Sequence, residues 1–475
     1  MLDSGKLDIF DLKKIKINRT AKELEEAGKE LEEAGKEMRT KVSSEQLAEF
    51  VPVHRDVVAA IKKTESKMIQ ELLPLRHERM LASKFAFFRG TAELMEQDLK
   101  DQYQSHIPLI ICGDAHVNNY GFYASPERQL IFGLNDFDES RIGNWESDLK
   151  RLLVSARLAG EENGFSDEQL DSVLHLITKT YRHSIKHNDK LSLFQRLYSS
   201  YEIHDMIAAI DTLNNSASQM NEILNKIIKK SSRSNSEQIV KKMTKLNKNG
   251  QLRFSENAPR AKHINAEKYA EILQGFNHYR NNVRQDIRIF LGNFSINDII
   301  RYSVGVGSFG TRCYLLLLTG NEGSHLVLQI KEAMPLRYNL LRLPTAEAIK
   351  NGVLAGRRIV TAQRTLQASS DPFLGSTSFG GRSYYVRQFR DMKESIKVNK
   401  LDYESFNLYC QICSTLLAIA HFQSPTAPMV RGYLKGQKAL DDGLVEWTNA
   451  YAKQVAIDFD DFRNSLQDNN GLITK

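Results

Sequence analysis

The chain has 475 residues, of which 41% are hydrophobic and 26% are charged, and its formal net charge at neutral pH is +7. These values are ordinary for a soluble globular protein, and the length suffices for two or three structural units. No apolar run approaches the roughly 18 residues of a membrane span and no secretory signal is evident, so we expect a cytoplasmic protein without a membrane partner.

The modest positive charge fits either affinity for phosphate-bearing ligands or a solvated surface. No motif for nucleic-acid binding accompanies it, so we expect no nucleic-acid partner. The four cysteines agree with a reducing compartment. Cys410 and Cys413 form a C-x-x-C pair, but a zinc site needs about two more ligands, so we interpret both as residues on one face of a helix.

Residues 1–45 form a charged arm that contains a repeat, because KELEEAG at residues 22–28 recurs at residues 29–35. Leu24, Leu31 and Met38 follow one another every seven residues, which predicts a helix with an apolar stripe. Two glycines and barely three heptads make a poor independent coiled coil. We therefore expect this helix to dock on the body or to stay mobile rather than to dimerise.

We expect residues 46–290 to form a mostly helical large lobe. Within it, Arg89 lies among aromatic residues and fits either a phosphate-binding arginine or an arginine that leaves a core helix to pair with a carboxylate. The Lys-, Ser- and Asn-rich stretch from Lys226 to His263 is typical of a partly exposed connection. The helical pattern covers Gln46 to Leu99, Asp148 to Ala159 and Asp167 to His187, with more helix through residue 228.

Two short apolar runs in this lobe each end in a group of polar side chains. Pro108–Cys112 and Leu130–Leu134 have the pattern of buried strands joined by the polar loop Tyr120–Arg128, and we expect them to pair as a hairpin. Gly-Asp-Ala-His-Val-Asn-Asn follows the first run and Asn-Asp-Phe-Asp-Glu follows the second. Such crowded carboxylates would repel one another unless a cation or a polar substrate neutralised them, so we expect a functional site here.

The spacing of these groups indicates their chemistry. An Asp followed five residues later by an Asn, and after a strand by Asp-Phe, is how kinase-type enzymes place a base and magnesium ligands. Asp114 would deprotonate the acceptor hydroxyl, while Asn119 and Asp136, assisted by Asp138, would hold Mg²⁺. The form GDAHxxN is more similar to aminoglycoside phosphotransferases than to protein kinases. By the same resemblance, Asp148 would buttress the catalytic loop from the next helix.

Residues 291–400 contain a glycine-rich segment, and we expect them to form a small antiparallel-sheet lobe that binds a nucleotide. The next apolar run, Cys313–Leu318, is soon broken, so the glycines fit a strand-turn-strand that covers phosphates better than a dinucleotide fold. The residues expected to contact the nucleotide in this G-x-G-x-x-G segment are Gly305, Gly307, Ser308 and Gly310.

Lys331 ends the following apolar strand, at the position where a kinase lysine holds the α- and β-phosphates of ATP. An edge-strand lysine that points to solvent is the alternative. The acidic partner that such a lysine usually has is not obvious. Glu347 has suitable spacing and Gln363 lies on the better predicted helix, so both stay open.

The order of these segments is the reverse of that in an ordinary kinase, because the catalytic segment precedes the glycine segment and Lys331. The helix predicted at Tyr403–Phe422 fits the one that normally precedes a catalytic loop, and residues 401–475 would complete the large lobe. We therefore predict an α+β, protein-kinase-like fold of two lobes in circularly permuted order. Permutation is tolerated where termini and new joints lie at the surface.

Several strings, including LRHERMLASKFAFFRGTA, GDAHVNNYG, LNDFDES, WESDLKRLLVSARLA, VGVGSFGTRC, LQIKEA and YYVRQFRDMK, resemble those of the bacterial domain-of-unknown-function family 2252. The resemblance runs from about residue 35 over nearly the whole chain. It implies a kinase-like fold and a nucleotide site, but no substrate. The duplicated KELEEAG and the His-Phe-Gln-Ser-Pro at His421 depart from the family pattern.

Together these features predict an ATP- and Mg²⁺-dependent phosphotransferase-like enzyme with Asp114 and Lys331 as catalytic residues, acting on a small-molecule hydroxyl or on a protein. One alternative is a metal-dependent phosphoesterase that uses Asp114, His116, Asp136 and Asp138 to ligate cations. A second is a nucleotide-binding pseudokinase scaffold, and nucleotidyl transfer on the same fold is a third. The sequence identifies neither the acceptor nor the oligomeric state.

Overall fold

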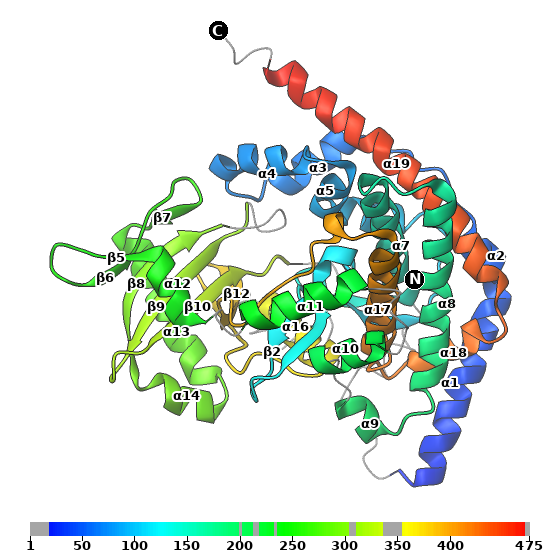
Figure 1. Cartoon of the computed structure of the whole chain (residues 1–475), viewed down its shortest axis with the longest axis horizontal. Coiled ribbons are helices and arrows are strands. Elements are labelled where there is room, and N and C mark those ends of the chain that lie inside the picture. The colour runs from blue at the N-terminus through cyan, green and yellow to red at the C-terminus, as the bar shows by residue number, and fades with distance from the viewer. Residues whose placement is uncertain are drawn as a thin grey trace.

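The computed structural model describes residues 19–198, 202–211, 218–231, 235–303, 310–335 and 354–470. The chain is a mixed α+β protein in which a sheet and its helices lie to one side of a larger helical part (Figure 1). The sheet is antiparallel, with strand order β11-β12-β10-β9-β8-β7. Its strands are Ala261–His263 (β7), Phe294–Tyr302 (β8), Cys313–Gly320 (β9), His325–Glu332 (β10), Gly375–Phe379 (β11) and Arg382–Gln388 (β12).

Helices cover both faces of this sheet, which explains the continuous apolar run in β9. Leu316 and Leu318 face the helices Ala266–Asn282 (α13) and Gln285–Leu291 (α14). Leu315 and Leu317 point to the other face, toward Ser236–Met243 (α12). Because successive strand residues alternate between faces, a strand buried on both sides is apolar throughout.

The stretch from Lys226 to His263, expected to be an exposed connection, is more ordered than its composition indicated. It contains α12, the short hairpin of Thr244–Leu246 (β5) and Leu252–Phe254 (β6), and strand β7. The apolar pair Ile239 and Val240 anchors α12 on the sheet. The few apolar residues of this polar segment thus pack on the sheet.

The helical part is built around one deeply buried helix, Trp145–Glu162 (α7). The expected helical regions are confirmed within the described residues, and none of their helices combines the length and apolar character needed to cross a membrane. The other helices of this part are Ala21–Lys41 (α1), Ser44–Ala48 (α2), Val57–Glu65 (α3), Leu73–Met80 (α4), Lys84–Gly90 (α5), Ala92–Asp98 (α6), Asp167–Asn188 (α8), Leu193–Tyr198 (α9), Ile203–Asp211 (α10), Ser218–Ser231 (α11), Tyr403–His421 (α17), Ala427–Leu434 (α18) and Ala439–Asn470 (α19).

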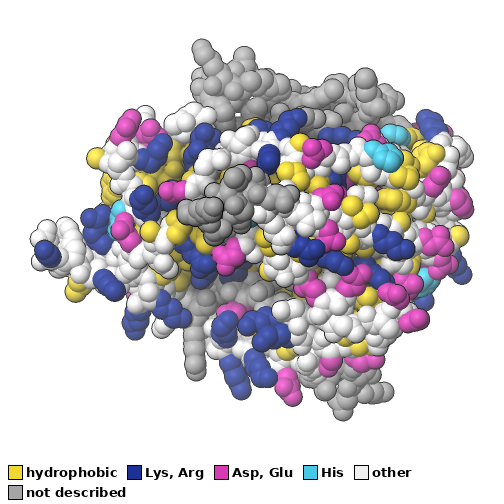
Figure 2. Space-filling model, turned by 90° about the horizontal axis from the view of Figure 1, so that it is seen from above, with side chains coloured by type: hydrophobic (Ala, Val, Ile, Leu, Met, Phe, Trp, Pro, Cys, Tyr) yellow, Lys and Arg dark blue, Asp and Glu magenta, His cyan; other side chains and the backbone are white. Residues whose placement is uncertain are grey.

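Two observations bear on the composition. Cys410 and Cys413 are fully buried on α17, which confirms their expected place on a helix. On the face shown in Figure 2, basic and acidic side chains are interspersed over much of the surface. The net positive charge therefore does not form one continuous basic surface there.

The expected hairpin of the two apolar runs near the site is wrong in its pairing. Pro108–Ile111 (β1) pairs with Arg141–Asn144 (β4), whereas Leu130–Leu134 (β3) pairs with Tyr120–Ala124 (β2). The segment expected to be a loop is therefore itself a strand followed by a tight turn, in which Ser125 N–H donates to Gln129 O. Tyr120 and Phe122 are apolar at every second position, which is the signal that favours a strand.

The N-terminal helix α1 docks on α18, which confirms one of the two outcomes expected for the arm. The two helices lie so close together that a Cβ on Gly35 would be 2.0 Å from Met429 O, and one on Gly432 would be 2.0 Å from Glu32 O. Arg39 donates to the carbonyl oxygens of Gly432, Tyr433 and Lys435 and so satisfies the C-terminal end of α18.

This contact gives the two copies of the repeat opposite expected responses to alanine. We expect Gly35→Ala to destabilise the protein by about 1–3 kcal/mol, because the added methyl group meets backbone atoms of α18. Gly28 occupies the equivalent position of the first copy, and a Cβ there would meet nothing within 4 Å. Gly28→Ala should therefore stabilise by about 0.5–1 kcal/mol through helix propensity. Urea denaturation measures both values, and equal effects of the two substitutions would contradict the docked arrangement.

Candidate functional site

Three residues on one face of helix α7 form hydrogen bonds with the loop that follows β1 and hold it in place. Asp148 accepts the N–H groups of Cys112 (2.7 Å) and Gly113 (2.8 Å) on its two carboxylate oxygens. Ser155 Oγ accepts Val117 N–H at 2.9 Å, and Arg151 Nε donates to Asp114 Oδ1 at 2.8 Å. Positions 148, 151 and 155 share one helix face at helical spacing, so a single rigid element fixes the whole loop.

Asp148 is in turn held by two other helices. Its Oδ2 lies 3.2 Å from His421 Nε2 at the end of α17, and Tyr181 OH on α8 lies 2.7 Å from His421 Nδ1. Asp148 and His421 are both almost fully buried. The expectation that Asp148 buttresses the loop is confirmed by these contacts. His421, which follows Asp148 by 273 positions, was not predicted to take part.

The segment after His421, whose role the sequence left open, holds β1. Ser424 Oγ accepts Ile110 N–H at 2.9 Å, and Thr426 donates its hydroxyl to Pro108 O. Gly113 follows β1 with φ of +82°, a conformation that favours glycine, and a Cβ there would lie 2.2 Å from Glu139 O. The backbone at Gly113 is therefore held by the anchored strand β1 before it and confined by the Glu139 carbonyl group beside it.

Asp114 is 14% exposed and faces two basic side chains besides Arg151. His116 Nε2 lies 3.6 Å from Asp114 Oδ2. Burial lowers the pKa of His116 to about 4, so the ring is neutral at pH 7. Burial also lowers the pKa of Arg89, against the opposing charge of Asp114 nearby. Arg89 Nε has no hydrogen-bond partner in the part of the chain that the structure describes.

Lys331 joins the sheet to the helical part. It lies on β10 between β9 and β12 and is only 4% exposed, so it is not an edge-strand lysine in solvent. Its Nζ lies 3.4 Å from Asp136 Oδ2 and forms an ion pair with Asp138 Oδ2. The residues that the sequence predicted from two distant segments therefore meet in one cluster.

Burial and neighbouring charges shift the pKa values of the three residues of this cluster in different directions. Desolvation favours protonation of Asp136, but Lys331, followed by Arg387 and Lys393, lowers its pKa to about 2. Burial and the neighbouring charge of Asp136 raise the pKa of Asp138. Burial would lower the pKa of Lys331, but the two carboxylates raise it well above its usual value. One lysine thus balances two adjacent carboxylates.

Two oxygen atoms of this cluster fit a hard cation. Asp136 Oδ1 and Asp138 Oδ1 are buried and accept no hydrogen bond from any residue that the structure describes. Magnesium takes oxygen ligands, commonly one or two carboxylates together with phosphate oxygens and water. No group of three or more His, Cys, Asp or Glu side chains within the described ranges has the arrangement of a metal site. The donor set fits a cation shared with a phosphate better than one caged by protein alone.

Asn119 ties the two loops together through its carboxamide. Its Nδ2 donates to Asp114 O at 2.8 Å and to Asp136 O at 3.0 Å, and its Oδ1 accepts Asp136 N–H at 2.8 Å. These bonds fix the distance between the candidate base and the candidate metal ligand. A role of Asn119 as a metal ligand stays a prediction, and one lone pair of Oδ1 remains for it.

The structure describes only some of the remaining residues that the sequence predicted to take part in the site. Gly305, Gly307, Ser308 and Glu347 lie outside the described residues. Gly310 has φ of +102°, and its carbonyl oxygen accepts Ile69 N–H at 2.8 Å. Gln363, on the helix Leu354–Leu366 (α16), donates to Gln367 Oε1 rather than contacting Lys331.

Arg358, for which no role was predicted, connects α16 to the loop of Asp138. Its guanidinium donates to Asp138 O at 2.8 Å and to the carbonyl oxygen of Ser140. Arg358 is almost fully buried. An arginine within the apolar face of an amphipathic helix was the available signal for such a role.

Comparisons with known proteins give one match. A family model described as "Uncharacterized protein conserved in bacteria (DUF2252)" matches residues 68–465. No curated protein and no solved structure matches the chain.

Proposed function

The chain belongs to this family of uncharacterised bacterial proteins, and from that premise we propose that it is an ATP- and Mg²⁺-dependent phosphotransferase that acts on a hydroxyl group of a small molecule. The observation that carries the proposal is the meeting of Lys331 with Asp136 and Asp138 beside the loop of Asp114. A cation–carboxylate cluster next to a candidate base is the set of groups that phosphoryl transfer requires.

The order of elements around the sheet supports this proposal. The glycine-rich segment joins β8 to β9, Lys331 lies on the next strand, and α16 follows before β11 and β12. Protein kinases hold ATP phosphates with a glycine-rich loop, a lysine on the third strand and a helix after it. Helix α17 then leads back to Asp148 through His421, which supports the permuted order of the two lobes.

The chain's own residues would act mainly by positioning and charge. Asp114 would accept the proton of the acceptor hydroxyl, and Lys331 would bind phosphate oxygens. Asp136 and Asp138 would hold Mg²⁺ through their unpartnered oxygens. Bound Mg²⁺ would neutralise charge that builds on the transferred phosphoryl group. Asn119 and Arg358 would hold these groups at fixed positions relative to one another.

Thermal unfolding with ATP tests this proposal. A ligand that binds only the folded state at a hundredfold excess over its Kd stabilises by about 2.7 kcal/mol, so we expect ATP to raise the unfolding temperature of the wild type only when Mg²⁺ is present. Asp136→Asn should abolish this shift because it removes the charge of a metal ligand. Asp286→Asn is the matched control, since Asp286 is an exposed carboxylate of α14.

Other results would point elsewhere. No shift with any nucleotide, together with a shift by Mn²⁺ or Zn²⁺ alone, would overturn the proposal in favour of a metal-dependent phosphoesterase. A nucleotide-binding scaffold is the second candidate, because α16 contains no acidic residue that could pair with Lys331. Magnesium-dependent ATP binding without turnover on any acceptor or water would favour that scaffold.

A further inference from the structure

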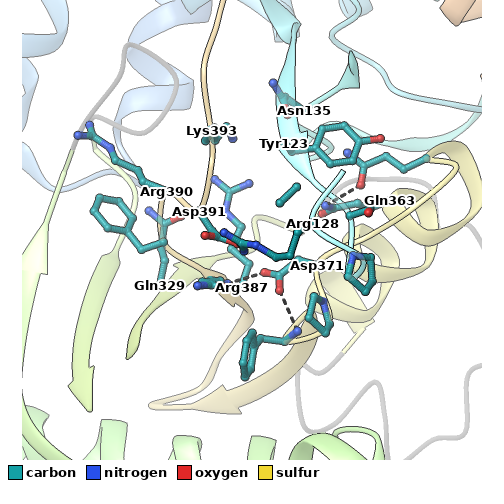
Figure 3. Close-up of a pocket in the computed structure, with 18 of the residues that line it drawn as sticks. Tyr123, Arg128, Asn135, Gln329, Gln363, Asp371, Arg387, Arg390, Asp391 and Lys393 are labelled. Atoms are coloured by element: carbon teal, nitrogen blue, oxygen red, sulfur yellow. Dashed lines mark hydrogen bonds and ion pairs between the residues drawn. The ribbon is translucent and has the colours of Figure 1, made fainter. Parts of the chain in front are cut away.

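A cavity of about 630 Å³ lies between the end of β12, the segment after it and the turn that joins β2 to β3. Figure 3 shows that basic side chains reach this space from several elements. The lining contains five basic residues against two acidic ones, Asp371 and Asp391. Basic residues therefore outnumber acidic residues in the lining by three.

The two acidic residues are already engaged. Asp391 pairs with Arg128 at 2.5 Å on the rim. Asp371 accepts the backbone N–H groups of Gln388 (2.5 Å) and Phe373 (2.8 Å). Among the residues that the structure describes, neither carboxylate forms an ion pair with Arg387 or Lys393.

Within the described residues, neither Arg387 nor Lys393 forms an ion pair with a carboxylate, although both feel the charge of Asp136. Arg387 Nε donates to Gln329 Oε1 at 2.9 Å, which is a neutral acceptor. Within the described residues, no hydrogen bond or ion pair involves Lys393. Both residues line the same space and are labelled around it in Figure 3, Arg387 on β12 and Lys393 on the segment after it. Desolvation lowers the pKa of Lys393, and the positive charge of Arg387 lowers it further.

The cavity adjoins the candidate site through residues next to it in the chain, although none of Asp114, Asp136, Asp138 and Lys331 lines it. Asn135, which lines it, directly precedes Asp136, and Gln329 lies two residues before Lys331 on β10. Arg387 and Lys393 both act on the charge of Asp136. Arg89, which lies beside Asp114, also lines the cavity. An occupant of the cavity would therefore lie beside residues that adjoin Asp114 and Asp136.

We propose that this cavity is an anion subsite in which Arg387 and Lys393 bind a phosphate group of a substrate, either the nucleotide's own or one carried by the acceptor. An arginine and a lysine on one wall are a common pair for phosphate, and an anion between them would relieve their mutual repulsion. The binding of phosphate stands on the cavity alone. Its assignment to a substrate of this enzyme rests on the proposed function.

Calorimetric titration of the full-length protein with pyrophosphate in the absence of divalent cations tests the subsite. We expect the wild type to bind pyrophosphate, and Arg387→Gln and Lys393→Gln to bind it at least tenfold more weakly. Lys397→Gln is the matched control, because it removes the same charge from the same segment at a position that does not line the cavity. Equal affinity in all four proteins, or no binding by the wild type, would overturn the proposal.

Two further arms separate the outcomes. Asp136→Asn should keep pyrophosphate binding while it loses Mg²⁺-dependent ATP binding. Pyrophosphate binding without ATP binding by the wild type would therefore contradict the proposed function and leave the subsite intact. ATP binding without pyrophosphate binding would contradict the subsite alone. ATP titrations identify the source of the phosphate. If Arg387→Gln weakens ATP binding as much as pyrophosphate binding, the subsite holds the nucleotide's phosphates. If ATP affinity is unchanged, it holds a phosphate of the acceptor.

Discussion

Replacing Asp114 by asparagine is expected to lower ATP turnover by about 10²- to 10⁴-fold, the usual contribution of a general base, while Mg²⁺-dependent ATP binding stays as in the wild type. Asparagine has nearly the same shape and can still accept the hydrogen bond from Arg151 Nε. It cannot accept a proton from the acceptor hydroxyl. Lys331, Asp136 and Asp138 form their cluster without contact to the Asp114 carboxylate, so nucleotide binding should not depend on it.

The measurement is phosphate release with water as acceptor, and transfer once an acceptor has been found, alongside the thermal shift with ATP and Mg²⁺. Asp286→Asn should match the wild type in both assays. A fall in turnover of less than tenfold would place the base elsewhere. Loss of the thermal shift in Asp114→Asn would mean that this carboxylate contributes to nucleotide binding.

Local features of the sequence predicted most elements but not their partners. The apolar runs of β1, β3, β9 and β10 and the helical periodicity of α7, α8 and α17 are local signals, and each gave an element close to its observed place. Strand pairing is a non-local property. The expected hairpin was wrong because β2 and β4 each offered a better neighbour, through a tight turn and through the return of the chain after Asp138.

The same distinction applies to the candidate site. Asp148 was found from the sequence, and Arg151 and Ser155 could have been, because they follow it at helical spacing on the face that holds the loop. Arg358 and Arg387 could not be placed, since Arg358 contacts Asp138 across 220 positions of chain. The partner of Lys331 was sought near α16. The structure instead gives it Asp136 and Asp138, residues that the sequence had assigned to metal.

Replacing Asp148 by alanine is expected to have the largest effect on stability, a loss of about 3–5 kcal/mol, because removal of a buried charged partner leaves its counterparts unsatisfied. The substitution would leave the N–H groups of Cys112 and Gly113 without acceptors inside the protein. It would also remove the contact of His421 Nε2, and with it one anchor of α17. Urea denaturation of wild type and variant gives the difference in unfolding free energy.

Two variants divide this effect into its parts. Ser155→Ala removes one neutral acceptor of the same loop from the same helix face and should cost only about 1 kcal/mol. Asp148→Asn keeps one acceptor oxygen and should fall between the two alanine substitutions. If Asp148→Ala costs no more than Ser155→Ala, the carboxylate does not carry the loop. If it costs the expected amount, the position of Asp114 depends on a residue that never touches substrate, and variants at Asp148 should lose ATP turnover together with stability.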